Sequence, residues 1–193
     1  MRTTAGMRRG GVPRPGISAE RYSTPAIVLH WVMALLVLGL LAIGLYMTGL
    51  RLSPEKLQLY SWHKWAGVTV FLLAIVRVAW RLVRRPPALP SHMSGPARLA
   101  AHAGHGLLYL LLFAIPLSGW LMSSAKGFQT VWFGVLPLPD LIGKDRDLGD
   151  LLQTVHWYLN LLLMAAVAAH VAAALKHHFL DRDDVLKRML PGR

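Results

Sequence analysis

The sequence contains no cysteine, and this absence excludes several kinds of chemistry. Disulfides, thiolate metal sites, iron–sulfur clusters and the covalent attachment motif of c-type haem all require cysteine. Any haem in this protein must therefore be held non-covalently, by side chains such as histidine. Acidic residues are also scarce, with nine Asp and Glu against 21 Lys and Arg, and charged residues make up only 16% of the chain.

Apolar residues are abundant instead. They form 54% of the 193 residues, which is too large a share for an ordinary soluble domain. Four long segments account for most of them, and each has the roughly 20 residues needed to cross a hydrocarbon core about 30 Å thick. The first is too long for the apolar part of a signal peptide, so we expect it to remain in the protein. The expected fold class is all-α, an integral membrane four-helix bundle, with spans at about residues 26–50, 59–82, 99–122 and 151–175.

The remaining segments are short and differ in character. Residues 1–21 are rich in Arg, Gly, Pro and Ser without an apolar period, which predicts a flexible basic tail. Residues 22–180 form the expected four-helix domain, and residues 181–193 a second tail with a short surface helix that ends before Pro191. The longest connection, residues 123–150, has an apolar centre and is expected to lie on the membrane surface.

The distribution of Lys and Arg predicts the orientation in the membrane. The net charge of +12 does not indicate a nucleic-acid site, because the basic residues lie at the edges of the apolar segments. Fourteen of them fall on the two tails and the second connection, against six on the first and third connections. Cytoplasmic segments carry the excess of Lys and Arg, so both termini are expected to be cytoplasmic.

Four of the nine histidines lie inside the expected spans, at two depths. His30 and His170 share a level near the cytoplasmic ends of the first and fourth helices. His63 and His156 share a level near the outer ends of the second and fourth helices. His156 and His170 are fourteen residues apart, which separates them by about 21 Å along one face of the fourth helix. Ionisable residues inside a membrane are energetically costly and usually functional. For any one of these histidines alone, the alternative is that it merely forms a hydrogen bond between helices.

The pairing of the four histidines by depth favours haem over zinc as the bound group. Two opposed imidazoles at one level of a bundle are suited to six-coordinate haem iron, whereas zinc prefers three or four ligands at one level. The sequence therefore predicts two non-covalent haems of b type, one between His30 and His170 and one between His63 and His156. Small residues near the ligands, including Gly67 one turn after His63, leave room for a porphyrin or serve ordinary close helix packing.

Further polar residues are expected at the cytoplasmic level. Arg77 lies fourteen residues after His63, near the level of His30 and His170, and could bind a haem propionate or reach the lipid headgroups. A second group of histidines could line a quinone pocket and supply protons, or could simply be wetted at the membrane surface. That group consists of His102, His105, His177 and His178. His92, in a proline-rich connection, is expected to be only solvated.

These features together resemble the bacterial cytochrome b561 family over the chain from about Arg21 to its end. The resemblance rests on the ligand spacings and on short motifs. The motifs are Leu29-His30-Trp31, His63 with Arg77, Ala101-His102-Ala103-Gly104-His105, His156 with His170, His177-His178, and the ending Leu186-Lys187-Arg188-Met189-Leu190-Pro191. The resemblance implies a di-haem electron carrier of the bacterial inner membrane, with His30 and His170 binding one haem iron and His63 and His156 the other.

The resemblance also implies candidate reactions. A branch of compact relatives oxidises superoxide on the periplasmic side and passes the electron to ubiquinone. Basic residues on the outer side would then attract the anion, although acidic neighbours weaken this effect. They are Lys56, Lys64, Lys126, Lys144 and Arg146. Two alternatives remain open: a cytochrome b subunit that connects a larger oxidoreductase to the quinone pool, and a metal-ion transporter lined by histidines.

Overall fold

A computed structural model describes residues 21–192, and the predicted tail of residues 1–21 lies almost wholly outside these residues. Four long helices dominate the described part: α1 (Thr24–Gly49), α2 (Pro54–Val83), α3 (Gly95–Ala125) and α4 (Arg146–Phe179). Each is long and apolar enough to cross a membrane, so the predicted four-helix membrane bundle is confirmed. A short antiparallel pair, β1 (Val131–Trp132) and β2 (Leu136–Pro137), and a 3-10 helix η1 (Lys187–Met189) complete the fold.

Capping residues set where the helices begin. Ser53, Ser94 and Asp145 accept a hydrogen bond from the backbone N–H three residues later, at the starts of α2, α3 and α4. Proline occupies the first turn of α1, α2 and α3, where no N–H partner is needed. Since these caps lie in polar sequence outside the apolar runs, three of the helices start several residues before the predicted spans.

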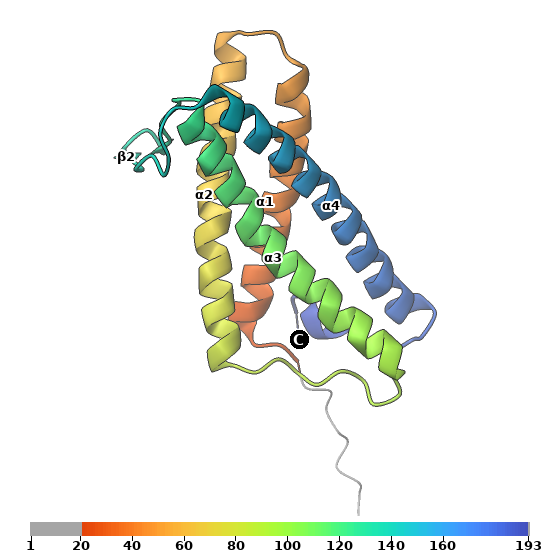
Figure 1. The fold of residues 1–193 in the computed structure, drawn as a ribbon. Coiled ribbons are helices and arrows are strands. Elements are labelled where there is room, and N and C mark those ends of the chain that lie inside the picture. The colour runs from red at the N-terminus through yellow and green to blue at the C-terminus, as the bar shows by residue number, and fades with distance from the viewer. Residues whose placement is uncertain (1–20, 193) are drawn as a thin grey trace, which may run out of the picture.

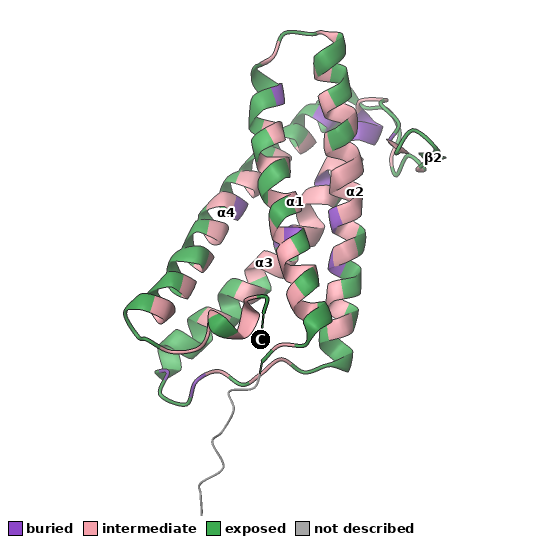
Figure 2. Ribbon diagram, turned by 180° about the vertical axis from the view of Figure 1, so that it is seen from behind, coloured by how far each residue is buried: buried purple, intermediate pink, exposed green. Residues whose placement is uncertain are grey.

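The helices are arranged as two pairs. α1 packs mainly against α2 and α3 against α4, while α2 and α3 join the two pairs. Figure 1 shows α4 leaning away from α1 along its length. A small core of Met33, Val70 and Ala74 connects α1 and α2 at mid-height. Many other large apolar side chains are exposed, and Figure 2 shows exposed and half-buried residues along all four helices. This is expected where lipid rather than protein covers the surface.

The two ends of the bundle differ. The end that holds the first described residues and the C-terminus is called the tail end, and the opposite end, with β1 and β2, the hairpin end (Figure 1). At the tail end, Trp31 Nε1 donates to the Met189 carbonyl oxygen at 2.7 Å. The predicted short helix of the tail is present as η1 and ends before Pro191.

The hairpin was not predicted from the sequence. Trp65 Nε1 donates to the Val131 carbonyl oxygen at 2.6 Å, and Trp132 Nε1 donates to the Trp65 carbonyl oxygen at 3.2 Å. These contacts hold β1 against α2. Phe133 and Val135 remain exposed, consistent with the predicted contact with the membrane surface.

Candidate functional site: two histidine pairs

The first histidine pair joins α1 to α4 near the tail end. The ring centres of His30 and His170 lie 6.2 Å apart, with the ring planes at 68°. His105 of α3 lies beside this pair, with its ring centre 5.4 Å from that of His170. The structure therefore brings together the two residues that depth matching paired, and it adds a third histidine at the same level.

The second pair joins α2 to α4 nearer the hairpin end. The ring centres of His63 and His156 are 6.4 Å apart and their planes meet at 76°. Both pairs thus bridge the two helix pairs of the fold, and α4 supplies one histidine to each. This arrangement follows from the spacing of His156 and His170, which places both on one face of α4.

The ring separations fit one metal atom in each pair. A metal–imidazole bond is about 2 Å long, so two imidazoles on opposite sides of one metal have ring centres roughly 6 Å apart. Both measured separations, 6.2 and 6.4 Å, match that spacing. The 5.4 Å between His105 and His170 is shorter and corresponds to direct edge contact between the rings.

Residues of α3 pack closely against the His156 ring. Ser118 Oγ lies 2.9 Å from His156 Nδ1, and the carbonyl oxygen of Ile115 lies 3.2 Å from the same nitrogen. Ser118 is buried, and a Cβ added to Gly119 would lie only 3.2 Å from His156 Cε1. Two acceptors at Nδ1 favour the proton on that nitrogen, which leaves Nε2 free to bind a metal.

His63 is held differently. Its Nδ1 is buried and has no hydrogen-bond partner among the described residues. Such an unpaired polar atom is costly unless another group completes the site. A Cβ on Gly44 would lie 3.3 Å from His63 Cε1, whereas one on Gly67 would meet nothing within 4 Å. Gly67 therefore borders open space rather than a packed side chain, and its role in making room for a porphyrin stays a prediction. Gly44 and Gly119, which the sequence did not single out, are the glycines that lie against the histidine rings.

Arg77 reaches the level of the first pair, as its spacing from His63 predicted. Its Nη2 donates to His30 Nδ1 at 3.0 Å, and its Nε donates to the Tyr109 hydroxyl at 3.2 Å. An imidazole that binds a metal through Nε2 carries its proton on Nδ1 and cannot accept this bond. Arg77 Nη2 would therefore have to leave His30 Nδ1 when a metal binds there through Nε2, and its Nη donors would become free for an anion while Nε stays on Tyr109.

The other tail-end histidines differ in their surroundings. His102 is exposed on α3 and His105 contacts His170. His177 is bound to two carboxylates, and His178 has a buried Nδ1 without a hydrogen-bond partner among the described residues. The quinone pocket expected from these four histidines stays a prediction.

Three basic residues of the hairpin end line an open surface pocket of about 440 Å³ between the end of α3 and the start of α4. Lys126, Lys144 and Arg146 contribute to its wall, together with Asp145 and Asp150. Lys126 is 3.0 Å from Asp150, so part of the positive charge is neutralised. Lys64 and Lys56 each donate to a backbone carbonyl oxygen, of Phe128 and Leu50 respectively.

The fold and the site define an integral membrane helical bundle with paired histidines between its helices. The family model of prokaryotic cytochrome b561 matches residues 21–192. "Cytochrome b561 homolog 2" of Escherichia coli K12 is 39% identical over 89% of this chain and 92% of its own length. A Yersinia pestis protein named "Probable superoxide oxidase CybB" is 28% identical over 90% of this chain and 98% of its own length.

The chain belongs to the prokaryotic cytochrome b561 family, as its resemblance predicted. It is therefore a membrane electron carrier that binds b-type haem, and a multi-pass protein of the inner membrane. This membership favours the electron carrier over the metal-ion transporter that the histidines alone left open.

Proposed function

We propose that the protein holds two haems, one between His30 and His170 and the other between His63 and His156. The observation that carries this proposal is that each ring pair has the spacing of two ligands on one metal atom. Bound haems would supply two one-electron carriers at different depths. Along α4 the two levels are about 21 Å apart, a large part of the roughly 30 Å hydrocarbon core, so the bundle offers a path across it.

Arg77 is proposed to bind a propionate of the tail-end haem. A guanidinium and a carboxylate form two parallel charge-assisted hydrogen bonds, which are among the strong ones in proteins. The support is the position of Arg77 beside His30 and the need for it to leave His30 Nδ1 when the ring binds iron through Nε2. Tyr109, which already contacts Arg77, would hold the turned side chain in place.

The proposed direction of transfer is from the hairpin end to the tail end. The excess of Lys and Arg on the tail-end segments supports a cytoplasmic tail end and a periplasmic hairpin end. The pocket lined by Lys126, Lys144 and Arg146 would then face the periplasm and could draw in a small anion. This side is proposed as the entry for electrons.

Superoxide is the proposed donor and ubiquinone the proposed acceptor. Two superoxide anions each lose one electron and become dioxygen, and one ubiquinone takes up the two electrons and two protons. The relative named as a probable superoxide oxidase supports this reaction. At the tail end, His102, His105, His177 and His178 are the proposed sources of hydrogen bonds and protons for the quinone.

Proteoliposomes that contain the purified protein test this function. With an enzymatic source of superoxide outside and ubiquinone in the bilayer, we expect quinol to form at a rate that depends on the haem-loaded protein. A double substitution, Lys144→Gln with Arg146→Gln, should lower the rate several-fold at low ionic strength and much less at high salt, because charge steering is screened. No quinol formation above protein-free liposomes would contradict the reaction. A redox subunit that copurifies in equal amount would instead favour the alternative, a cytochrome b subunit of a larger oxidoreductase.

The proposed hairpin-end haem can be tested by changing Ser118 and measuring the reduction potential of the haem. Hydrogen bonds to the second nitrogen of a ligand histidine orient the ring and tune the metal. Ser118→Ala removes one of the two partners of His156 Nδ1 and leaves the Ile115 carbonyl. We expect both haems to be retained and the potential of one of them to shift by tens of millivolts, about 1 kcal/mol or less for one neutral hydrogen bond.

The measurement for Ser118→Ala is a potentiometric titration followed by visible absorption. Ser61→Ala is the matched control, because Ser61 donates only to the Leu57 carbonyl of its own helix. An unchanged potential for both haems would show that Ser118 does not act on a haem ligand.

A further inference from the structure

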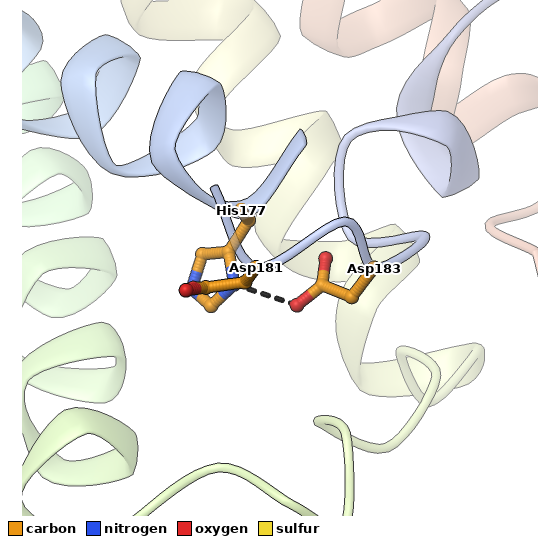
Figure 3. A group of neighbouring side chains, drawn as sticks. All are labelled: His177, Asp181 and Asp183. Carbon is orange, nitrogen blue, oxygen red and sulfur yellow. Dashed lines mark hydrogen bonds and ion pairs between the residues drawn. The ribbon is translucent and has the colours of Figure 1, made fainter. Parts of the chain in front are cut away.

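A second cluster of metal-binding side chains lies at the tail end, where α4 ends. His177 is in the last turn of α4, and Asp181 and Asp183 belong to the turn that follows. One ligand atom of each lies within 4.8 Å of the others. Figure 3 shows the His177 ring beside both carboxylates. The haem proposal does not use this cluster as a ligand set.

The distances within the cluster approach those around a tetrahedral ion. With bonds of about 2.0 Å to zinc, neighbouring ligand atoms are roughly 3.3 Å apart. His177 Nδ1 lies 3.2 Å from Asp181 Oδ2 and 2.7 Å from Asp183 Oδ2. A fourth group approaches from the connection between α2 and α3, because His92 Nε2 is 3.6 Å from Asp183 Oδ2. Side chains from two distant parts of the chain therefore converge on Asp183.

Asp183 is the buried centre of the cluster. Its side chain is only 6% exposed, and buried carboxylates are uncommon unless they are hydrogen-bonded or paired, as this one is to His177 Nδ1 at 2.7 Å. Its Oδ1 accepts from the Val185 backbone N–H at 3.0 Å, so that Oδ2 is the oxygen that faces the two histidines. Its backbone N–H donates to the His177 carbonyl oxygen at 3.1 Å. The carboxylate is thus oriented before any ion arrives, as ligand carboxylates usually are.

The charges of the cluster leave a role for a divalent cation. Two carboxylates carry two negative charges, and Lys176 supplies one positive charge through its bonds to Asp181 at 2.6 and 2.8 Å. Lys176 bonds to Asp181 and not to Asp183, so a cation bound between His177 and Asp183 would bring positive charge directly to the buried carboxylate.

We propose that His177, Asp181 and Asp183, with His92 as the fourth ligand, form a binding site for a divalent transition-metal ion such as Zn²⁺. Two imidazole nitrogens and two carboxylate oxygens suit zinc and its neighbours, whereas Mg²⁺ and Ca²⁺ prefer oxygen alone. His92 is 61% exposed and can turn to complete the set. The ion would fasten the α2–α3 connection to the C-terminal tail, whose Met189 carbonyl contacts Trp31 beside His30.

Zinc binding to the haem-loaded, full-length protein tests the site. After treatment with a chelator, titration calorimetry in detergent with ZnCl₂ alone should show one saturable site per chain. Asp183→Asn, which keeps the shape of the side chain and removes its charge, should weaken binding at least 100-fold. His92→Ala should weaken it at least tenfold. Lys176→Met should strengthen it, because Asp181 loses a cationic partner that competes with the metal ion for its oxygens.

Two matched controls distinguish zinc binding at the cluster from non-specific binding to surface histidines. Asp184→Asn alters a neighbouring carboxylate that pairs with Arg188 at 2.9 Å and lies outside the cluster, and His102→Ala removes an exposed histidine of α3. Both should bind zinc as the unaltered chain does. Absence of a stoichiometric site, or equal binding by Asp183→Asn, would overturn the proposal. Unchanged binding by His92→Ala, or by Lys176→Met, would remove His92 or Asp181 respectively from the ligand set.

Discussion

Purified His156→Ala protein should contain one haem per chain, half of the two haems proposed for the unaltered protein. The substitution removes the α4 ligand of the hairpin-end pair and leaves His63 alone at that level. A haem with a single protein ligand in a membrane bundle loses both an axial bond and its fixed orientation. The tail-end pair of His30 and His170 should keep its haem, because the two levels are about 21 Å apart and share no ligand.

His30→Ala is the corresponding test of the other histidine pair. We expect this variant to lose only the tail-end haem. Haem is measured as the ratio of haem to protein, and the remaining centre is recognised by its reduction potential and its reduced-minus-oxidised spectrum. His102→Ala serves as the control, since His102 is an exposed histidine outside both pairs. One haem per chain in the unaltered protein would refute the two-level pairing. Two haems in His156→Ala would show that another residue is the ligand.

Gly119→Leu should also remove the hairpin-end haem, although residue 119 is not a ligand. A Cβ at this position would already lie 3.2 Å from His156 Cε1, closer than an ordinary contact. The further carbons of leucine cannot be accommodated unless the ring moves, and overpacking of this kind usually costs about 1–3 kcal/mol. The least costly response is rotation of His156 away from Ser118 and from the position facing His63.

The effect of Gly119→Leu is measured by the same haem ratio and by the melting temperature. Gly39→Leu is the matched control, because Gly39 is exposed on α1 and a Cβ there meets nothing within 4 Å. The control should keep both haems. Gly119→Ala should give a milder result, with both haems bound and a displaced potential at one of them. If the Gly119→Leu protein binds two haems per chain, the position of the His156 ring is not critical for haem binding.

Much of the fold could be predicted from the sequence because the membrane simplifies the problem. A segment of about 20 apolar residues has few structures open to it in lipid, since every backbone polar group must be satisfied within the segment. The four helices were confirmed for that reason. Their starts were less well predicted, because caps such as Ser53 and Asp145 lie in polar sequence where the apolar pattern gives no signal.

The histidine pairs could be predicted because depth in a straight helix is a linear function of residue number. His30 with His170, and His63 with His156, face each other as depth matching indicated, while their role as haem ligands stays a prediction. The level of His105 was predicted in the same way, but its contact with His170 was not. Its contact with His170 depends on the rotation of α3 about its axis, which the spacing of residues on one helix does not determine.

The sequence by itself determined the class of structure, the levels of the four histidines and the family. It could do so because these depend on hydropathy, helix rise and motif spacing, which are properties of single segments. Only the tertiary structure decided which groups touch the rings: Ser118 at His156, Gly44 at His63 and Arg77 at His30. The same holds for the convergence of His92 on Asp183 and His177. Each of these contacts joins residues on different elements, so it exists only after the helices have packed and the tail has returned to the tail end.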